Sequence, residues 1–416
     1  MLIVSIPNKK FQEKIHLPAS KSESNRVLII EALAKYQNTD QNLPDYQIKN
    51  ISDARDTQTM LKLLQSQEHI LDVLDAGTTM RFLTAFCAIT RRKTILTGTP
   101  RMQERPIKIL IDALTELGAN IKYLQKTGFP PIEIIDFEQK TNQISIEGNV
   151  SSQYISALLM IAPLLKNGLE LHLQNKISSQ PYILMTLELM KYFGIIYEWN
   201  NNIIFVKEGK YQMKNYAIEA DWSAASYWYS IVALAETGTE VFLPYLKEQS
   251  LQGDSVIAQI MQFFGVETIY QEQGVKIKKI NEPKEKHFTY DFAHCPDLAQ
   301  TIVALCLAKN INLQATGLES LRIKETDRTA ALAKEAAKLG YTFTSTDEKN
   351  WFLKQENPLQ EHQTAIIATY EDHRMAMAFA PLAMLLPIGI ENENVVEKSY
   401  PNFWEELKKI ANEVKK

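Results

Sequence analysis

The chain of 416 residues is poor in cysteine and carries little net charge. Cys87, Cys295 and Cys306 form no CxxC pair and cannot all be joined within one chain, so we expect buried free thiols and a reducing, cytoplasmic setting. Basic residues do not dominate, since 45 Lys and Arg stand against 49 Asp and Glu. This balance argues against a nucleic-acid-binding surface, which needs a net basic face.

Long apolar runs are also missing. The longest ones, residues 155–165 and 376–390, are shorter than a membrane span and each contains proline, so both are predicted to be buried helices. The first ten residues, MLIVSIPNKK, lack the basic region and apolar core of a signal peptide and are expected to form a strand. No HExxH motif occurs and no second histidine stands at ligand spacing from His373, so a metal site is not expected.

What the sequence does contain is a recurring order of elements, in which an amphipathic helix is followed by a glycine and then by a strand. The four clear examples contain Gly118, Gly194, Gly265 and Gly340. Their spacing of roughly 70–76 residues is typical of a repeated supersecondary unit, and glycine enters the left-handed region at a helix end without steric penalty. Less clear versions precede Ile70 and surround Gly389. The alternative is that this order of elements is common in any α/β protein and does not mark a repeat.

The length and this pattern predict two domains of mixed α/β structure, because single cores rarely grow to such a size. The most distinctive short segments place small hydroxyl, amide or glycine residues at predicted helix starts, beside a cation in every segment except 151–153. They are residues 20–26, 76–81, 100–106, 151–153, 324–328 and 372–377. Free backbone N–H groups and the helix dipole favour anions there. Together the segments predict one site for small, highly charged molecules such as phosphates and carboxylates.

The first cationic segment contains a capping box formed by Ser20 and Glu23. The box places Lys21 at the start of a helix, and Arg26 falls four residues after Ser22 on the same face. A phosphate or carboxylate could contact Lys21, Ser22 and Arg26 together. The alternative is a capped helix whose cations face solvent.

Arginine and glycine distinguish the next two segments. Gly77 allows close backbone approach and Thr78 offers a hydroxyl, although an ordinary helix cap also explains this turn. Arg101 and Arg105 are four residues apart between two prolines, which indicates guanidiniums held in place for bidentate recognition. A solvated surface is the competing interpretation.

Hydroxyl groups stand at two further predicted helix starts. Ser151, Ser152 and Gln153 precede an apolar helix, and Ser179 with Tyr182 begins another. Such groups bind an anion or a polyol, or they simply cap the helix.

The second half supplies the carboxylates. Asp297 precedes an apolar helix, where a dipole-favoured first-turn carboxylate is the plain explanation. Glu325 lies between Lys324 and Arg328, whose charges should keep it ionised, whereas a bound polyanion would make it a better proton carrier. The alternative for Lys324–Arg328 is a ladder of ion pairs on a helix surface, worth little. Arg374 begins another buried-looking helix.

Taken in this order, the motifs resemble those of the 5-enolpyruvylshikimate-3-phosphate synthase family. The resemblance runs from Leu17 to about Leu407. It rests on LPASKSESNR, DAGTTMRFLTA, LTGTPRMQERPI, VSSQYISALLM, SQPYILMTLELM, HCPDLAQTIVAL, LRIKETDRTAAL and TYEDHRMAMAF. Eight ordered motifs are far more specific than any one of them.

The resemblance implies an α/β fold of two domains, each built from three repeated α/β units (an inside-out α/β barrel), with the active site in the cleft between them. Residues 18–221 would form one domain, and residues 1–17 with 222–416 the other. The implied reaction transfers the enolpyruvyl group of phosphoenolpyruvate to the 5-hydroxyl of shikimate 3-phosphate through a tetrahedral intermediate, in the shikimate pathway to aromatic amino acids. No metal or organic cofactor is implied. A cytoplasmic monomer is expected whose partners are these two small molecules, not nucleic acid or membrane.

Carried over position by position, the resemblance assigns side chains to each substrate. Shikimate 3-phosphate would contact Lys21, Ser22, Arg26, Ser151, Ser152, Gln153, Ser179, Tyr182, Asp297 and Lys324. Phosphoenolpyruvate would contact Lys21, Gly77, Thr78, Arg105, Gln153, Arg328, Arg374 and Lys398, the last an ordinary surface lysine unless the fold buries it. Asp297 near the hydroxyl and Glu325 near the methylene would transfer protons, with Lys21 assisting.

Several positions depart from the usual family pattern. They are Asp75 for Asn, Phe82 for Pro, Gln180 for Lys, Ser320 and Leu321 for Asn-Trp, and Glu371 for a small or amide residue. Asp75 would be an awkward charge beside an anion unless it caps its helix or is paired. The departures bear on affinity and inhibitor response more than on the reaction. Because Gly77 leaves room at the phosphoenolpyruvate site, sensitivity to glyphosate is predicted.

Two other functions remain to be separated from this one. The sister enolpyruvyl transferase that acts on UDP-N-acetylglucosamine shares the fold, but it usually has a catalytic cysteine on a mobile loop, and no cysteine here stands in such a motif. A catalytically inactive fold-mate that only binds anions is the second alternative. The presence of Lys21, Asp297, Glu325 and Arg374 argues against it.

Overall fold

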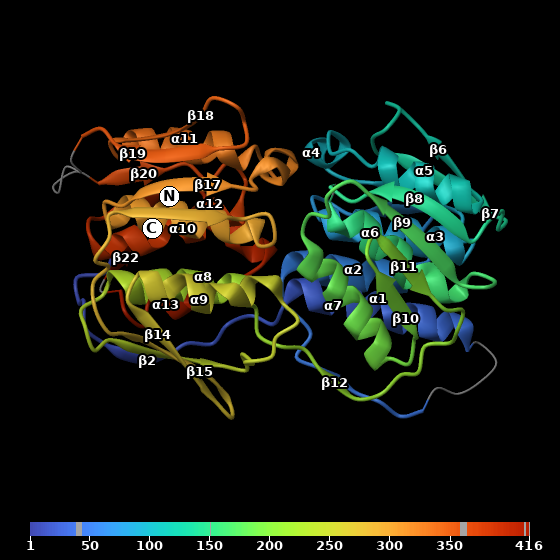
Figure 1. The fold of residues 1–416 in the computed structure, drawn as a ribbon, viewed down its shortest axis with the longest axis horizontal. Helices are drawn as coiled ribbons and strands as arrows, with labels where there is room; N and C mark the ends of the chain where they lie inside the picture. The colour runs from blue at the N-terminus through green and yellow to red at the C-terminus, as the bar shows by residue number, and fades with distance from the viewer. Residues whose placement is uncertain (39–43, 150, 358–363, 412, 416) are drawn as a thin grey trace. The chain divides into compact units, whose positions relative to one another are not determined.

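The computed structural model describes residues 1–38, 44–149, 151–357, 364–411 and 413–415, and it divides into two compact units (Figure 1). Unit 1 consists of Met1–Ala19 and Glu219–Lys416, and unit 2 consists of Ser20–Ile218. The chain therefore begins and ends in unit 1, with unit 2 inserted after the first nineteen residues.

Unit 1 contains three four-stranded sheets among its described residues. The first has the order β14 (Val266–Gln271), β15 (Gly274–Lys279), β13 (Glu240–Pro244) and β2 (Gln12–Lys14). The second has the order β16 (His287–Asp291), β17 (Asn312–Thr316), β19 (Trp351–Gln355) and β18 (Tyr341–Ser345). The third has the order β20 (Ala365–Ile367), β21 (Ile388–Ile390), β1 (Leu2–Ser5) and β22 (Glu413–Lys415).

The described part of unit 2 contains two four-stranded sheets and a small two-stranded one. The larger sheets have the orders β10 (Tyr197–Asn200), β11 (Ile203–Val206), β9 (Leu169–Gln174), β8 (Gln143–Glu147) and β4 (Ile70–Asp72), β5 (Thr94–Thr97), β7 (Ile132–Phe137), β6 (Ala119–Tyr123). The small sheet pairs β12 (Tyr216–Ala217) with β3 (Ile48–Lys49).

One pairing pattern recurs in all five larger sheets. An edge strand runs parallel to its neighbour, and the next two strands are antiparallel. In the third sheet of unit 1, β1 occupies the position that a later strand takes in the others, so the N-terminal strand pairs beside the C-terminal one (Figure 1). The expected first strand is confirmed, and the chain is built from repeated α/β units.

Three helices in each unit are almost wholly buried over most of their length. In unit 1 they are α8 (Trp222–Leu234), α10 (Ala299–Ala308) and α12 (His373–Phe379), and in unit 2 they are α1 (Lys21–Gln37), α3 (Gly77–Ile89) and α6 (Ser152–Ile161). Helix α10 packs against α8 and α12, and α3 packs against α1 and α6. Helices that are apolar on every side are stable only in such an interior.

The two apolar runs behave differently at their ends. The first forms α6 and the turn η1 (Ala162–Leu164), as predicted. In the second, α12 and η5 (Ala380–Met384) end before Pro387, and the last three residues form β21. The prediction of one helix to residue 390 is wrong because proline interrupts it and β21 has strand partners on both sides.

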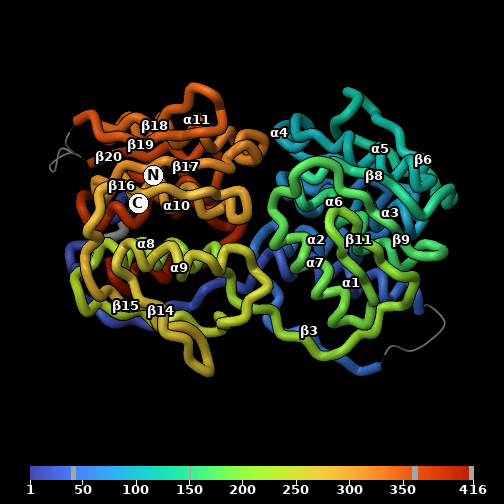
Figure 2. Tube along the Cα trace, viewed as in Figure 1, coloured from blue at the N-terminus to red at the C-terminus, as the bar shows by residue number. Residues whose placement is uncertain are grey.

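The remaining helices are α2 (Arg55–Gln65), α4 (Pro100–Gln103), α5 (Lys108–Leu117), α7 (Gln180–Tyr192), α9 (Ile257–Phe263), α11 (Arg328–Lys338) and α13 (Phe403–Leu407), with short turns η2 (Gly253–Val256), η3 (Pro296–Leu298), η4 (Glu319–Ile323) and η6 (Glu393–Lys398). Among these helices, α5, α9 and α11 pack against strands, and α2 and α7 pack against the buried helices of unit 2. In Figures 1 and 2, α8 and α9 lie alongside the hairpin of β14 and β15.

The helix–glycine–strand repeat is confirmed at its four clear positions. Gly118, Gly194, Gly265 and Gly340 follow α5, α7, α9 and α11 with φ values of 123°, 91°, 73° and 81°. The two unclear versions are wrong as glycine caps. No glycine joins α2 to β4, and Gly389 lies inside β21 rather than after a helix.

Cys87, Cys295 and Cys306 are buried free thiols, as expected. No helix in the described ranges is both long and apolar enough to cross a membrane. Within the same residues, no group of three or more His, Cys, Asp or Glu side chains is arranged to hold a metal ion.

The first prediction concerns the repeated glycine. In Gly118→Ala the new methyl group would lie 1.8 Å from the carbonyl oxygen of Glu138, in a backbone with φ of 123°. We expect the free energy of unfolding to fall by about 2 kcal/mol or more, because neither the backbone nor that carbonyl can accommodate a side chain. Urea unfolding followed by circular dichroism measures this change.

Gly209→Ala is the matched control in the same unit. There the nearest atom to the new methyl group, Ile195 Cδ1, is 3.6 Å away. Its unfolding free energy should change by less than about 1 kcal/mol. Equal losses in the two variants would show that the left-handed backbone of Gly118 is not what requires glycine.

Candidate active site

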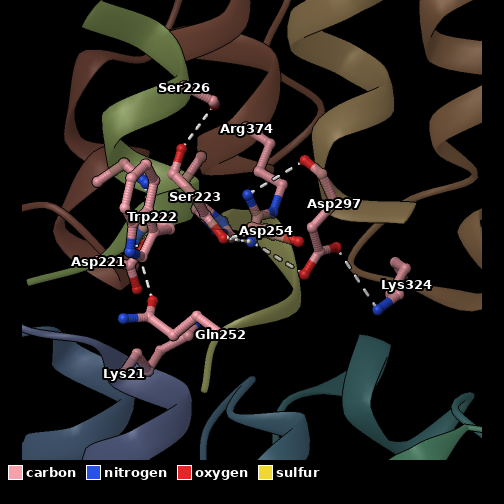
Figure 3. Close-up of polar contacts among 12 residues, drawn as sticks. Lys21, Asp221, Trp222, Ser223, Ser226, Gln252, Asp254, Asp297, Lys324 and Arg374 are labelled. Atoms are coloured by element: carbon pink, nitrogen blue, oxygen red, sulfur yellow. Dashed lines mark hydrogen bonds and ion pairs between the residues drawn. The ribbon is translucent and has the colours of Figure 1, made fainter. Parts of the chain in front are cut away.

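In unit 1 the starts of the three buried helices meet at the side chain of Arg374 (Figure 3). Arg374, at the start of α12, donates to Asp297 Oδ2 at 3.0 Å and to Ser223 Oγ at 3.4 Å. Asp297 lies in η3, directly before α10, and Ser223 lies in the first turn of α8. Arg374 also approaches the hydroxyl of Tyr227 at 3.4 Å. One guanidinium therefore joins residues from three elements far apart in the sequence.

Arg328 is the centre of the charge arrangement. Its Nε donates to Asp372 Oδ2 at 2.7 Å, one terminal nitrogen donates to Asp297 Oδ1 at 2.8 Å, and the other donates to Glu325 Oε2 at 3.0 Å. The residue is 1% exposed. Burial alone would lower the pKa of Arg328, but the three carboxylates raise it above the ordinary arginine value. A buried charge persists only when it is paired and hydrogen-bonded in this way.

Two lysines complete the group. Lys324 Nζ lies 3.7 Å from Asp297 Oδ1, and Lys398 Nζ lies 3.7 Å from Glu325 Oε1. Burial lowers the pKa of Lys324. Lys398 is 1% exposed, so the expectation of an ordinary surface lysine is wrong. The ladder of ion pairs on a helix is also wrong, because Lys324 and Glu325 lie before α11 begins.

Asp297 is surrounded by these cations. Burial alone would raise its pKa, but the charges of Arg374, Lys324 and Arg328 outweigh burial and hold the pKa well below the usual aspartate value. The carboxylate is therefore ionised in this arrangement. An anion that competed for the same cations would make Asp297 more basic.

In unit 2 a second set of polar residues lies at helix starts. Lys21 Nζ donates to Asp56 Oδ2 at 3.1 Å, and Asp56 is buried in the first turn of α2. Gln153 Nε2 donates to Thr78 Oγ1 at 3.0 Å, which joins the start of α6 to the start of α3. Two of the segments predicted to bind anions, residues 76–81 and 151–153, are therefore in direct contact.

Arg105 and Gly77 fit against each other. A Cβ atom at Gly77 would lie 2.6 Å from a terminal nitrogen of Arg105. Arg105 is 7% exposed and donates to the carbonyl of Asp75 at a long 3.4 Å, and its Nε has no hydrogen-bond partner among the residues that the structure describes. A buried guanidinium with an unused donor is suited to bind a carboxylate or phosphate.

Arg101 and Arg105 differ in burial, although their positions in the sequence gave both the same prediction. Arg101 is exposed and pairs with Glu104 at 3.1 Å. The solvated-surface interpretation therefore holds for Arg101, and the held guanidinium is Arg105.

Arg26 is buried among other helices. It donates to the Ser22 carbonyl at 2.8 Å, to Thr186 Oγ1 at 2.7 Å and to Ser156 Oγ at 3.1 Å, which ties α1 to α6 and α7. Burial lowers its pKa to about 10. The alternative of cations facing solvent is wrong for this helix.

The hydroxyl groups divide between capping and other roles. Ser151 caps α6 by accepting the N–H of Gln153 at 3.4 Å, and Ser152 is buried. Ser179 stands at the cap position of α7 with φ of 52° and makes no side-chain cap bond. Tyr182 contributes its backbone carbonyl, which accepts from Arg26 at 3.2 Å.

Four of the departures can be placed in the structure. Asp75 pairs with Arg55 at 3.3 Å, so its charge is compensated. Phe82 is buried with its ring centre 5.4 Å from the guanidinium carbon of Arg26. Leu321 is buried in η4, and Gln180 is an exposed first residue of α7. The side chain of Ser320 has no contact that explains the change.

Sequence reasoning missed several members of the site. Asp56 and Asp372 are the carboxylates that pair with Lys21 and Arg328, and the hydroxyl of Ser223 donates to Asp254 (Figure 3). Asp372 lies in the segment 372–377. The number of cations predicted at the site was a signal that further carboxylates, such as Asp372, must lie nearby to balance their charge. Tyr227 lies within an apolar helix, where no local signal distinguishes it.

The fold is α/β, and these residues place cations and carboxylates at the starts of buried helices, an arrangement suited to binding small polyanions. A family model described as EPSP synthase (3-phosphoshikimate 1-carboxyvinyltransferase) matches residues 6–407. A 3-phosphoshikimate 1-carboxyvinyltransferase of Bacteroides fragilis is 47% identical over 412 residues, which cover 98% of this chain and 97% of the relative. The enzyme of that name from Haemophilus influenzae is 33% identical over 435 residues, covering 98% and 99%.

Solved structures agree in fold. An EPSP synthase from Acinetobacter baumannii aligns over 100% of this chain and 99% of its own, with a TM-score of 0.77 at 19% identity. The chain belongs to the EPSP synthase family.

The second prediction concerns Asp297 and pH. Because its folded pKa lies below the unfolded value of about 3.9, the ionised carboxylate stabilises the fold fully above that value, and the stabilisation is lost as pH falls toward the folded pKa. Asp297→Asn should lower the unfolding free energy by about 3 kcal/mol at pH 7 and by clearly less at pH 3. Urea unfolding at both pH values measures the difference.

Glu272→Gln removes an exposed carboxylate from the same unit and serves as the control. It should change stability little at either pH. A loss for Asp297→Asn that is as large at pH 3 as at pH 7 would contradict the role of its charge.

Proposed function

We propose that the polar groups of units 1 and 2 act on one pair of substrates in the reaction of this family. The enzyme transfers the enolpyruvyl group of phosphoenolpyruvate to the 5-hydroxyl of shikimate 3-phosphate and releases phosphate. The observation that carries the site assignment is the sharing of Arg328 by Asp297 and Glu325, with Lys324, Arg374 and Lys398 beside them. Two carboxylates within a cationic group can accept and return protons while a polyanion is bound.

We assign phosphoenolpyruvate to the cations with donors directed at an anion. They are Arg105, Arg328, Arg374, Lys398 and Lys21, with Gly77, Thr78 and Gln153 beside Arg105 or joined to one another. Arg105 supports this assignment best, because it is buried with an unused donor. Shikimate 3-phosphate is assigned to Lys21, Ser22, Arg26, Ser151, Ser152, Gln153, Ser179, Tyr182, Asp297 and Lys324. Arg26 would contribute through a guanidinium already held by α6 and α7.

The proposed chemistry uses the two carboxylates in turn. Glu325 takes up a proton from solvent when the polyanions bind. Asp297 then takes the proton of the 5-hydroxyl as the hydroxyl oxygen bonds to C2 of phosphoenolpyruvate, while the protonated Glu325 delivers its proton to the methylene carbon. In the elimination step Glu325, ionised again, takes back a proton from the new methyl group as the bond between C2 and the phosphate oxygen breaks, and Asp297 returns its proton to the departing phosphate. Binding of both polyanions draws Arg374 and Lys324 toward the substrates, which raises the basicity of Asp297 when it is needed. Lys21 assists at the same oxygen atoms.

The finer organisation is also a proposal. The family's domains, 18–221 and 1–17 with 222–416, would correspond to units 2 and 1. We expect a cytoplasmic monomer that needs no metal or organic cofactor and binds neither nucleic acid nor membrane.

The buried cysteines bear on the related amino-sugar transferase. Burial raises the pKa of the Cys87 thiol to about 12, and burial also raises the pKa of Cys295 and of Cys306. Such thiols are protonated and inert at neutral pH. None of them is suited to the cysteine-dependent chemistry of that enzyme.

The third prediction tests the reaction and the role of Glu325. Wild-type enzyme should release phosphate only when shikimate 3-phosphate and phosphoenolpyruvate are both present. Glu325→Gln should retain Michaelis constants within a few-fold of wild type but lose about 10²–10⁴-fold in kcat, since it removes proton transfer and keeps the shape of the side chain. A coupled phosphate-release assay measures both quantities.

Glu319→Gln makes the same chemical change at an exposed residue of η4 and should leave turnover unchanged. Near-normal kcat in Glu325→Gln would show that Glu325 is not a proton carrier. Release with UDP-N-acetylglucosamine as the acceptor would favour the sister activity, and no release with either acceptor would indicate an anion-binding protein without catalysis.

The fourth prediction concerns inhibition by glyphosate. With no side chain at Gly77, the guanidinium of Arg105 lies against the backbone and the proposed phosphoenolpyruvate site keeps its room. Glyphosate, a small molecule with a phosphonate and a carboxylate, should therefore inhibit below the millimolar range and compete with phosphoenolpyruvate. An inhibition curve that stays flat into the millimolar range would reject this.

A further inference from the structure

The backbone just before α12 is held in an unusual conformation. Tyr370 and Glu371 have φ values of 53° and 55°, so two consecutive residues with side chains occupy the left-handed region. In that region the Cβ atom crowds the following carbonyl oxygen, and single residues visit it far more often than pairs. Such a corner persists only where the surrounding structure restrains it.

The restraint comes from a buried carboxylate on α11. Glu335, which is 0% exposed, accepts the hydroxyl of Tyr370 at 2.6 Å and the N–H of Ala368 at 3.2 Å. Lys338 pairs with the same carboxylate at 2.7 Å. On the other side of the corner, Asn392 donates to Glu371 Oε1 at 3.2 Å. Burial and the bond to Glu335 raise the pKa of Tyr370, so its hydroxyl remains a donor at neutral pH.

The corner leads directly into the charge arrangement of unit 1. Asp372, the next residue, caps α12 by accepting the N–H of Arg374 at 2.9 Å, and its other oxygen accepts from Arg328 at 2.7 Å. Asp372 is wholly buried. Any shift of the corner would therefore move the carboxylate that holds both Arg328 and the start of α12.

Helix α11 thus holds the beginning of α12 at two points. Arg328, its first residue, binds Asp372, and Glu335, seven residues later on the same face, binds the corner. The two contacts fix the distance between Arg328 and Arg374. Neither Glu335 nor Tyr370 is among the residues that the family resemblance assigns to a substrate.

We propose that Glu335 and Tyr370 are positioning residues, which hold the corner at Tyr370–Glu371 so that Asp372 presents Arg328 and Arg374 to phosphoenolpyruvate. The inference rests on the assignment of phosphoenolpyruvate to these two arginines under the proposed function. It also explains the setting of Glu371. Asparagine adopts the left-handed region more readily than glutamate does, so this chain depends on the restraint from Glu335 more than a chain with asparagine at this position would.

The fifth prediction compares Tyr370→Phe, Glu371→Asn and the double variant in the full-length enzyme. Tyr370→Phe removes only the hydroxyl that binds Glu335, and the Michaelis constant for phosphoenolpyruvate should rise about tenfold, which corresponds to about 1.4 kcal/mol. The constant for shikimate 3-phosphate should stay within about twofold, because Tyr370 acts through Arg328 and Arg374. Glu371→Asn alone should resemble wild type. In the double variant it should restore most of the lost affinity, since asparagine needs less restraint.

Tyr341→Phe is the matched control. Tyr341 also lies in unit 1, on β18, which packs against α11, and its buried hydroxyl has no hydrogen-bond partner among the described residues. Removing that hydroxyl should leave both Michaelis constants unchanged. Glu335→Gln is a second test should Tyr370→Phe not fold. It keeps one acceptor oxygen of the two and should raise the phosphoenolpyruvate constant about threefold.

The outcomes are distinct. A Tyr370→Phe enzyme that loses thermal stability but keeps the wild-type Michaelis constant for phosphoenolpyruvate would overturn the inference, because the corner would then be only structural. Equal increases in the constants for both substrates, or no rescue by Glu371→Asn, would also overturn it. A wild-type enzyme without phosphoenolpyruvate-dependent phosphate release would instead refute the proposed function.

Discussion

The arrangement in unit 1 depends on one buried guanidinium. Removing Arg328 from water is unfavourable unless every charge around it is compensated. Asp372, Asp297 and Glu325 each accept a hydrogen bond from it. Asp297 in turn pairs with Arg374 and Lys324, and Glu325 pairs with Lys398. The charges support one another, so none can be removed alone without leaving another uncompensated in the interior. The result is a set of cations and carboxylates fixed by mutual contacts, and charges fixed in this way are what electrostatic catalysis requires.

The repeated units explain how so many polar groups reach these places. All five larger sheets share one pairing pattern, although β1 replaces a later strand in one of them. In each sheet a buried helix precedes the strand that pairs in parallel with the edge strand. The helix starts therefore gather, as the contacts from Arg374 to Asp297 and Ser223 and from Gln153 to Thr78 demonstrate. Unsatisfied N–H groups at those starts favour anions. The packing of the buried helices thus also provides positions that favour anions at the N-termini of those helices.

Three of the departures from the family pattern, Asp75, Phe82 and Glu371, have specific partners in the fold. The charge of Asp75 is paired by Arg55, and the ring of Phe82 packs beneath Arg26. Glu371 occupies a left-handed position that suits an amide better, and its side chain is held by Asn392 while its neighbour Tyr370 is held by Glu335. In each case a residue that looks unsuitable in the sequence has a specific partner in the fold.

The sequence alone determined the α/β repeat, the glycines at helix ends and the helix starts that carry polar residues, because these depend on interactions among neighbouring residues. It also allowed the family to be recognised from ordered motifs. Tertiary structure alone decided that Arg105 is buried while Arg101 is exposed, that Lys398 pairs with Glu325, and that Asp56 and Asp372 belong to the charge arrangement. It also decided that the apolar run after α12 ends as a strand. Those outcomes depend on partners that are tens of residues away or more, and the spacing of residues along a chain contains no record of which distant side chains share the same buried volume.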